Sequence, residues 1–255
     1  SRKCAPEGMS RVDSGNRFGI SSTSMNTERP LLSVIIPILN EAATIRTIID
    51  RVQAVPVDKE ILIVNDGSTD GTAGVIDAMS DPNIRVFHHP QNRGKGAAIR
   101  TAIPHIRGRF AVIQDGDLEY DPQDFLKMLD VVQSRNGRAI FGSRILSHSR
   151  MSYLRYWIGG RGVTFFTNLF FGSRLTDEPT CYKMIESDLL KSLDLRTDGF
   201  EFCPEVTAKL LNRHIEILEV PITYAPRSIE EGKKIRWKDG VIALWVLLKL
   251  RLTGR

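Results

Sequence analysis

The stretch that decides the fold begins with the run Leu32-Ser-Val-Ile-Ile-Pro37 and resumes, after a short loop, as Asn40-Glu-Ala-Ala-Thr-Ile-Arg-Thr-Ile-Ile-Asp-Arg-Val52. The first part is apolar and β-branched, which is typical of a buried strand. The second part has apolar residues at helical spacing after an Asn that can cap a helix. The stretch therefore predicts a strand, a loop and a helix.

The same alternation continues toward the C-terminus. Further strands are predicted at residues 60–64, 84–88, 110–114 and 139–142, and helices at 72–79, 94–106 and 125–132. Because these strands are apolar without alternation, they favour a mostly parallel sheet that helices cover on both faces. We therefore predict an α/β fold with a single Rossmann-like sheet, whose ligands bind at the carboxyl ends of the strands.

The alternation is lost in the second half of the chain. Residues 144–176 are rich in Arg, Gly and aromatic side chains, and helices at 188–193 and 204–212 and a strand at 215–224 are predicted to follow. We expect acceptor recognition in this half. The predicted organisation is a disordered leader at 1–29, one catalytic domain at 30–235 and a C-terminal helix at 236–255.

The C-terminal helix is strongly apolar and is flanked by Lys and Arg, with Trp237 and Trp245 along it. Its uninterrupted apolar run, residues 241–248, is far shorter than the roughly 20 residues that span a bilayer. No segment is therefore predicted to cross a membrane. The helix either lies in a membrane interface or docks on the core, and both interpretations stay open.

The charge balance favours anionic partners. Lys and Arg number 35 against 30 Asp and Glu, a formal charge of +5. Phosphates, an anionic membrane surface and, less specifically, nucleic acid all fit this excess. The three cysteines, Cys4, Cys181 and Cys203, lie far apart without a CxxC motif, which indicates a reducing, cytosolic compartment.

The loop after the fourth predicted strand carries carboxylates at alternate positions, Asp115, Asp117 and Glu119. In an extended segment these side chains project the same way. Hard divalent cations prefer such oxygen ligands, so Mg²⁺ or Mn²⁺ bridging to a diphosphate is one interpretation. A solvated acidic turn before a helix is the other, and the position at the end of a buried strand favours the first.

Two further loops have the chemistry of a nucleotide site. Asp66, in Asn65-Asp-Gly-Ser68, could accept N–H groups of a base, although the segment also reads as a plain turn. Arg93-Gly-Lys-Gly96 opens a predicted helix, where backbone N–H groups and Lys95 could meet phosphate. The chain lacks both GxxxxGK[ST] and GxGxxG, which argues against an NTPase and a dehydrogenase.

Basic residues gather in the second half of the sequence, and Arg is suited to the fork-like recognition of phosphate. An acceptor or donor phosphate and an ordinary solvated surface both remain open. The residues are Arg144, Arg150, Arg155, Arg161, Arg174, Arg227, Lys233, Lys234, Arg236 and Lys238.

Four motifs in order resemble the family 2 glycosyltransferases of GT-A fold. They are Ser33-Val-Ile-Ile-Pro-Ile-Leu-Asn-Glu41, Val64-Asn-Asp-Gly-Ser-Thr-Asp70, Asn92-Arg-Gly-Lys-Gly-Ala97 and Asp115-Gly-Asp-Leu-Glu119. Later segments resemble the dolichyl- or polyprenyl-phosphate sugar transferase branch. These are Gly142-Ser-Arg144, Leu175-Thr-Asp-Glu-Pro-Thr-Cys-Tyr-Lys183, Gly199-Phe-Glu201, Val220-Pro-Ile-Thr-Tyr-Ala-Pro-Arg227 and Glu231-Gly-Lys-Lys-Ile235. The resemblance covers about residues 32–250.

The resemblance implies roles for individual residues. For the donor these are Pro37, Asn40, Glu41 and Asp66 at the nucleoside, with Lys95 and Asp115 near ribose and diphosphate. Asp117 and Glu119 would bind Mg²⁺ or Mn²⁺. The implied acceptor-phosphate ligands are Arg144, Arg155, Arg161, Arg227 and Lys234, and Asp117, Arg144 and Arg227 would take part in catalysis. Gly116 departs from the frequent Asp-Ala-Asp form by one methyl group, which we expect to be harmless.

The implied reaction is transfer of a sugar from GDP-mannose or a UDP-hexose to a polyprenyl or dolichyl phosphate, with inversion at the anomeric carbon. The enzyme would then sit at the cytoplasmic face of a membrane as a peripheral protein that does not bind nucleic acid. One alternative is transfer to a sugar hydroxyl, which needs a base, and Asp177 or Glu178 would be the candidate. A noncatalytic nucleotide-sugar sensor and a nucleic-acid-binding protein are the others.

Overall fold

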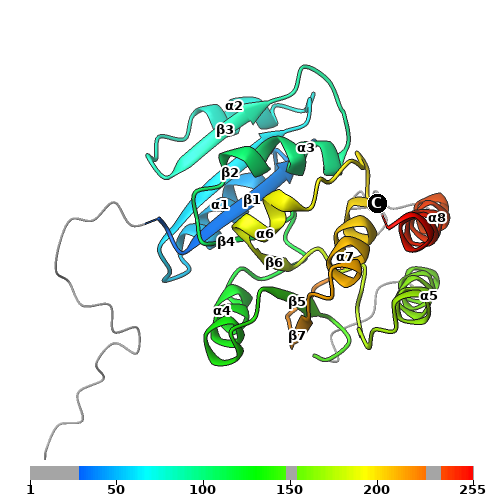
Figure 1. Ribbon diagram of the computed structural model, residues 1–255. Helices are drawn as coiled ribbons and strands as arrows, with labels where there is room; N and C mark the ends of the chain where they lie inside the picture. Colours follow the sequence, from blue (N-terminus) through cyan, green and yellow to red (C-terminus); the bar gives the residue numbers. More distant parts are fainter. Residues whose placement is uncertain (1–28, 148–153, 228–236, 255) are drawn as a thin grey trace, which may run out of the picture.

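The computed structural model describes residues 29–147, 154–227 and 237–254, with side chains from residues 157 and 238 onward in the last two ranges. Helices flank a twisted sheet, and three helices gather beside its far end (Figure 1). Apart from Arg29, the predicted leader lies outside the described residues.

The described residues form a seven-stranded sheet in the order β3-β2-β1-β4-β6-β5-β7. The strands are β1 Leu32–Ile38, β2 Lys59–Asn65, β3 Ile84–His88, β4 Phe110–Ile113, β5 Ala139–Ser143, β6 Lys183–Glu186 and β7 Ile217–Pro221. Among them, β6 alone runs antiparallel to its neighbours, β4 and β5. The prediction of a mostly parallel sheet is therefore confirmed.

Both faces of the sheet are covered, as the non-alternating strands predict. The helices are α1 Ile45–Gln53, α2 Thr72–Asp77, α3 Lys95–Ala102, α4 Asp124–Arg135, α5 Leu154–Phe171, α6 Ser187–Ser192, α7 Phe202–Asn212 and α8 Trp237–Thr253. Val34 and Ile36 of β1 pack with α1 and α4 in one apolar cluster, while Ile35 packs with α3, α6 and α7 in another. Neighbouring residues of a strand point to opposite faces, so one short strand supplies both cores.

The first helix begins four residues later than predicted, because Asn40 does not cap it. Asn40 adopts a left-handed backbone conformation, with φ of 53°, and the residue that caps α1 is Thr44. The Asn40 side chain accepts the Thr69 N–H at 2.8 Å, and its own N–H donates to Ser68 Oγ at 2.9 Å. Asn40 therefore ties the β1–α1 loop to the β2–α2 loop instead of capping a helix.

Other predicted boundaries shift less. The helix predicted to end at residue 106 ends at Ala102 and passes into a 3-10 turn, Ile103–His105, that contains Pro104. The strand predicted at 215–224 is shortened to Ile217–Pro221. Two elements were not predicted: β6, a four-residue strand with charged ends, and α5, which lies within the Arg- and Gly-rich stretch.

A third apolar cluster joins α5, α7 and α8 beside the sheet (Figure 1). Its buried members on α8 are Ala243, Leu247 and Leu250, so this helix docks on the domain. Large apolar side chains on α5 and α8 nevertheless remain exposed, including Phe165, Leu169, Trp245 and Leu252. Among the described residues no helix is both long enough and apolar enough to cross a membrane.

Candidate active site

The carboxylates predicted from the sequence lie just after β4, at the carboxyl end of the central strands. Asp115 Oδ1 lies 2.5 Å from Nζ of Lys95, the first residue of α3, and that ammonium also lies 3.0 Å from Cys181 Sγ. Burial would raise the pKa of Asp115, but the Lys95 charge outweighs it, so the pKa of the carboxyl is lowered. Asp115 and Lys95 thus form a fixed, ionised pair at the position expected for ribose and diphosphate.

Asp117 and Glu119 share a different cation, Arg227. Asp117 Oδ2 lies 2.6 Å from Arg227 Nη2, and Glu119 Oε1 accepts the Arg227 backbone N–H at 2.7 Å. The Tyr224 hydroxyl donates to the other Glu119 oxygen at 3.0 Å. Burial, followed by the nearby charges of Asp115 and Glu119, raises the pKa of Asp117 to about 7. Asp117 and Glu119 therefore lie close together in a buried site, around a single guanidinium.

Glu41 brings a further carboxylate to the same guanidinium. Its Oε2 lies 3.3 Å from Arg227 Nη1 and accepts the Thr44 hydroxyl at 3.0 Å. Its backbone N–H donates to Thr72 Oγ1 at 3.0 Å, which fixes the β1–α1 loop against α2. Arg227 therefore lies among Glu41, Asp117 and Glu119, which come from the ends of two neighbouring strands.

The predicted nucleoside residues occupy the adjoining loops. Pro37 is buried one residue before the end of β1. Asp66 is also buried, and its oxygens accept the backbone N–H groups of Arg93 at 2.9 Å and Gly94 at 2.7 Å and contact His89 Nδ1 at 2.6 Å. Asp66 therefore holds the β3–α3 loop in place, and its contact with a base stays a prediction.

Two glycines permit close approaches around this site. Gly67 has φ of +73°, and a Cβ there would lie 2.5 Å from the carbonyl carbon of Gln91, so no side chain fits between the two loops. At Gly116 a Cβ would lie 2.6 Å from Ile38 Cγ2. Ile38 therefore occupies the space that a methyl group would take, and the expectation that Gly116 is harmless stays a prediction.

Arg144, predicted at the acceptor phosphate, forms a bidentate ion pair with Asp177. Its Nε and Nη2 each lie 2.7 Å from an oxygen of Asp177, and its backbone N–H donates to the same carboxylate at 2.9 Å. The guanidinium also lies 5.1 Å from the ring centroid of Tyr224, whose hydroxyl reaches Glu119. Arg161, which is exposed, lies 3.4 Å from the Thr176 carbonyl oxygen. Arg144 therefore borders the carboxylate site, whereas Arg161 contacts Thr176, the residue before the partner of Arg144.

The structure does not describe two other predicted acceptor ligands. Arg155 lies in α5, but its side chain is outside the described residues, as is all of Lys234. Arg150, Lys233 and Arg236 also fall outside them. The acceptor roles of these residues stay predictions.

Of the two acids suggested as a base for a hydroxyl acceptor, Asp177 is engaged by Arg144 and Glu178 is fully buried, with its Oε2 unpartnered among the described residues. Burial would raise the pKa of Asp177, but the Arg144 charge dominates and lowers it, and both oxygens bind Arg144. Glu178 has no exposed surface, burial raises its pKa, and its Oε1 accepts the Thr207 hydroxyl at 2.9 Å. Neither acid is both accessible and poised to accept a proton.

The carboxylates of the site suit a divalent ion that the protein and the phosphates of a bound substrate would hold together. Among the residues that the structure describes, no three His, Cys, Asp or Glu side chains are grouped to hold a metal alone. Mg²⁺ is usually bound by one or two carboxylates together with substrate phosphates, so Asp117 and Glu119 fit that pattern. The Arg227 guanidinium against these carboxylates shows that the position accepts positive charge.

Two residues that organise the site, Tyr224 and Glu219, were not predicted. Tyr224 lies inside a quoted motif, yet nothing in the motif indicated its bond to Glu119. Glu219 accepts the backbone N–H groups of Thr176 at 2.8 Å and Asp177 at 3.0 Å and so supports the Arg144 pair from β7. A single acid in a strand gives no such signal.

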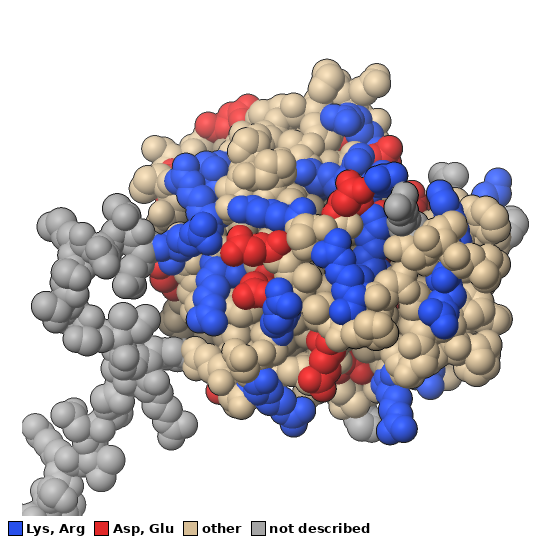
Figure 2. All heavy atoms as spheres, viewed as in Figure 1, with Lys and Arg blue, Asp and Glu red and all other residues tan. Residues whose placement is uncertain are grey.

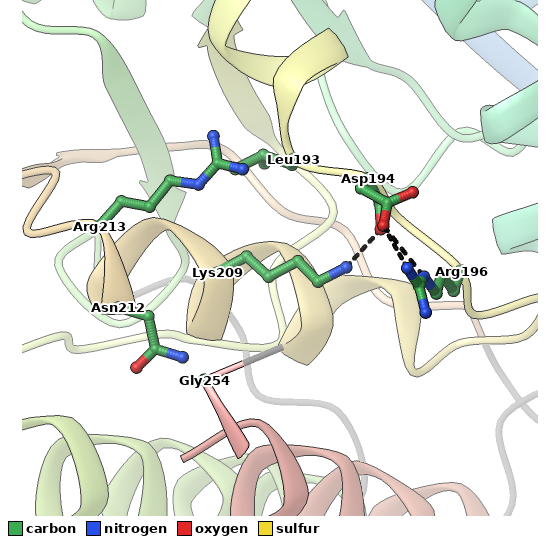
Figure 3. A pocket seen from close by; sticks show the side chains of 7 residues that line it. All are labelled: Leu193, Asp194, Arg196, Lys209, Asn212, Arg213 and Gly254. Carbon is green, nitrogen blue, oxygen red and sulfur yellow. Dashed lines mark hydrogen bonds and ion pairs between the residues drawn. The ribbon is translucent and has the colours of Figure 1, made fainter. Parts of the chain in front are cut away.

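A separate hollow of about 340 Å³ lies at the ends of α7 and α8, away from the predicted residues (Figure 3). Its cations are partnered, Lys209 with Glu205 at 2.8 Å and Arg196 with Asp194 at 2.6 Å. On the face seen in Figure 2, Lys and Arg alternate with Asp and Glu rather than forming one basic block. The strand-end carboxylates therefore remain the candidate site.

Solved structures show the same fold. Glucosyl-3-phosphoglycerate synthase from Mycobacterium tuberculosis, in complex with Mn²⁺, UDP and phosphoglyceric acid, matches with a TM-score of 0.66 at 18% identity, over 87% of this chain and 78% of that one. A complex of the same enzyme with Mg²⁺ and UDP matches with a TM-score of 0.64 at 19% identity, over 86% and 79%. These similarities identify the fold as GT-A.

Curated relatives cover most of the chain. A low-salt glycan biosynthesis hexosyltransferase from Haloferax volcanii is 31% identical over 79% of this chain, which spans only 49% of that protein's length. An undecaprenyl-phosphate mannosyltransferase from Micrococcus luteus is 26% identical over 86% of this chain and 97% of its own. A polyprenol monophosphomannose synthase from Mycolicibacterium smegmatis is 28% identical over 88% and 89%.

These relatives confirm the resemblance to the polyprenyl-phosphate sugar transferases. The model of the family described as glycosyl transferase family 2 matches residues 33–194, which include β1 to β6 and every predicted carboxylate of the site. The chain belongs to glycosyl transferase family 2, and it is a glycosyltransferase.

Proposed function

We propose that this enzyme transfers a sugar from a nucleotide-sugar to a polyprenyl or dolichyl phosphate, with inversion at the anomeric carbon. The observation that carries the proposal is the state of Asp177 and Glu178, the acids beside the site that a hydroxyl acceptor would need as a base. A phosphate monoester has a second pKa near 6, so at neutral pH it is largely a dianion and attacks without a base. A phosphate acceptor therefore fits a site without a free base at these positions.

The donor would lie across the carboxyl ends of β1, β2 and β4. Pro37, Asn40, Glu41 and Asp66 would hold the nucleoside, and Lys95 with Asp115 would contact ribose and diphosphate. Asp117 and Glu119 would hold Mg²⁺ or Mn²⁺, which supplies charge neutralisation on the departing nucleoside diphosphate. GDP-mannose and UDP-hexoses are the donors we propose to test.

The acceptor phosphate would be bound from the second half of the chain. Arg144 borders the carboxylates from the loop after β5 and Arg227 lies among them, and Arg161 would reach the phosphate from α5. Arg155 and Lys234 complete the proposed set. A fixed guanidinium orients the phosphate for in-line attack, and orientation is a large part of such catalysis. The relatives named for undecaprenyl phosphate and polyprenol support this acceptor class.

The exposed apolar side chains of α5 and α8 would meet a membrane. Phe165 and Leu169 on α5 and Trp245 and Leu252 on α8 are 61% to 77% exposed, and Lys249 and Arg251 lie beside them. Apolar side chains with flanking cations fit the interface of an anionic bilayer. We place the enzyme as a peripheral protein at the cytoplasmic face, where an acceptor with a long lipid tail presents its phosphate.

The test is a transfer assay with UDP- and GDP-sugars, Mg²⁺ or Mn²⁺, and a short polyprenyl phosphate either dispersed in detergent or embedded in anionic vesicles. We expect lipid-extractable sugar only when metal and acceptor are both present, and faster transfer in vesicles. Transfer to a soluble sugar hydroxyl, with none to lipid, would instead support the alternative acceptor. Donor binding without transfer to either acceptor would support a sensor.

A further inference from the structure

Arg227 is held by groups that the proposed reaction needs for something else. Its guanidinium contacts Asp117 at 2.6 Å and Glu41 at 3.3 Å, and its Nε lies 4.0 Å from Glu119. Asp117 and Glu119 are the proposed metal ligands. In this state the cation nearest to the metal position is therefore a protein side chain.

We propose that Arg227 is a built-in counter-cation of the metal site, and that arrival of the metal releases it to bind the acceptor phosphate. This inference rests on the proposed function, because it assigns Arg227 one partner before the donor binds and another afterwards. It makes the bound metal a condition for tight acceptor binding. Acceptor and metal would then bind with positive cooperativity.

The charge balance favours the exchange. Arg227 faces three carboxylates, Glu41, Asp117 and Glu119, whereas Asp115 is already paired with Lys95. Ionised, these three and Arg227 leave two negative charges uncompensated, which a divalent ion would balance. A compact divalent ion also approaches carboxylate oxygens to about 2.1 Å, closer than a guanidinium does. Asp117 would therefore attract a divalent ion more strongly than it attracts Arg227.

The hydrogen bonds of Glu119 hold the backbone around Arg227. One carboxylate oxygen accepts the Arg227 N–H and the other accepts the Tyr224 hydroxyl. Each carboxylate oxygen keeps a second lone pair, so Glu119 could bind a metal and still hold the backbone of Arg227 and the Tyr224 hydroxyl in place. Only the Arg227 side chain would then have to move, while the bond from the Ala225 N–H to the Glu119 carbonyl, at 2.8 Å, also persists.

Arg227 is also less completely satisfied than a permanent structural arginine. Its Nε is buried and has no hydrogen-bond partner among the described residues. Its contacts with Glu41 are long, at 3.3 to 3.4 Å. A guanidinium with an unused donor is suited to changing partners, because the second partner can satisfy the donor that the first left unpaired.

The test measures binding of Mn²⁺ alone, by the loss of the free-ion electron paramagnetic resonance signal, without nucleotide or acceptor. If Arg227 competes with the metal, Arg227→Met should lower the Kd for Mn²⁺ by about 5-fold or more, the range of ordinary coupling between sites. Arg144→Met is the matched control, because Arg144 pairs with Asp177 and touches no proposed metal ligand. Its Kd for Mn²⁺ should stay within about 2-fold of wild type, as expected for an uncoupled site.

The inference is overturned if Arg227→Met does not bind Mn²⁺ more tightly than wild type. Unchanged or weaker Mn²⁺ binding by Arg227→Met, or no detectable binding by it, would show that Arg227 does not compete for the site. Circular dichroism melting confirms that both variants are folded, and Arg227→Lys provides a second variant that keeps the charge and should bind Mn²⁺ more weakly than Arg227→Met. The transfer assay tests the proposed function separately. If wild type forms lipid-linked product but Arg227→Met gains no Mn²⁺ affinity, the exchange is refuted and the proposed function stands.

Discussion

Arg144 and Arg227 were both expected at the acceptor phosphate, yet the structure holds them in different ways. Arg144 has a dedicated partner, Asp177, with two contacts of 2.7 Å from its side chain. The backbone of Asp177 is in turn fixed by Glu219 on β7. Arg227 shares Asp117 and Glu119 with the proposed metal and keeps a buried Nε without a described partner.

The difference separates a fixed cation from an exchangeable one. A fixed guanidinium pre-organises one edge of a phosphate site, because its position does not change when the ligand arrives. An exchangeable guanidinium depends on which other cation is present. Removing one acidic residue at a time tests this difference, and we expect the largest effect at Asp117, a smaller one at Asp177 and the smallest at Glu219.

The largest effect is expected for Asp117→Asn, on the exchangeable side. Loss of a metal ligand removes several kcal/mol of transition-state stabilisation, so turnover should fall by about 10³-fold or more. The fold should persist, since Glu41 still pairs with Arg227. Transfer assays and thermal melting check both points. Turnover near that of wild type would exclude Asp117 as a metal ligand.

A smaller effect is expected for Asp177→Asn, which leaves the largely buried Arg144 without its negatively charged partner. Breaking such a pair typically costs about 3 kcal/mol or more of unfolding free energy. Urea unfolding measures the loss, and Glu186→Gln is the matched control because its pair with Arg138 is half exposed. The control should lose less than about 1 kcal/mol. Equal losses in both variants would mean that Arg144 is no more fixed than a surface residue.

The smallest effect is expected for Glu219→Gln, which keeps the shape of the support but removes its charge. The N–H groups of Thr176 and Asp177 would share a single amide oxygen, at a cost of about 1 to 2 kcal/mol. The same urea experiment applies. If stability does not change, Glu219 does not support the Arg144 pair, and another group must hold the loop at residues 176 and 177.

The first half of the fold was predictable because its signals are local. Strands such as Leu32–Ile38 are continuous apolar runs, and the helices after them carry their own periodicity. The start of α1 was wrong because Asn40 is used across loops, by Thr69 and Ser68, which a linear pattern does not reveal. The short strand β6 was not predicted, because it is defined by its pairing with β4 and β5 rather than by its composition.

The site was predictable in its residues but not in its pairings. Strand ends gather the side chains of Glu41, Asp115 and Asp117, and a parallel sheet brings those ends together. The cation that pairs with each carboxylate comes from a distant part of the sequence. Arg227 is 110 residues from Asp117, and Lys95 is 20 residues from Asp115. The roles of these residues in donor and acceptor binding stay predictions.

The position of β6 in the sheet limits the order in which the strands can pair as the chain folds. Strand β6 lies between β4 and β5, although it follows both in the sequence. A nascent chain that has emerged only to β5 can assemble β1 to β4 but lacks the strand that joins β5 to them. The sheet is therefore completed in its middle only after β6 has been synthesised, and until then β4 presents an unpaired edge that is open to mispairing.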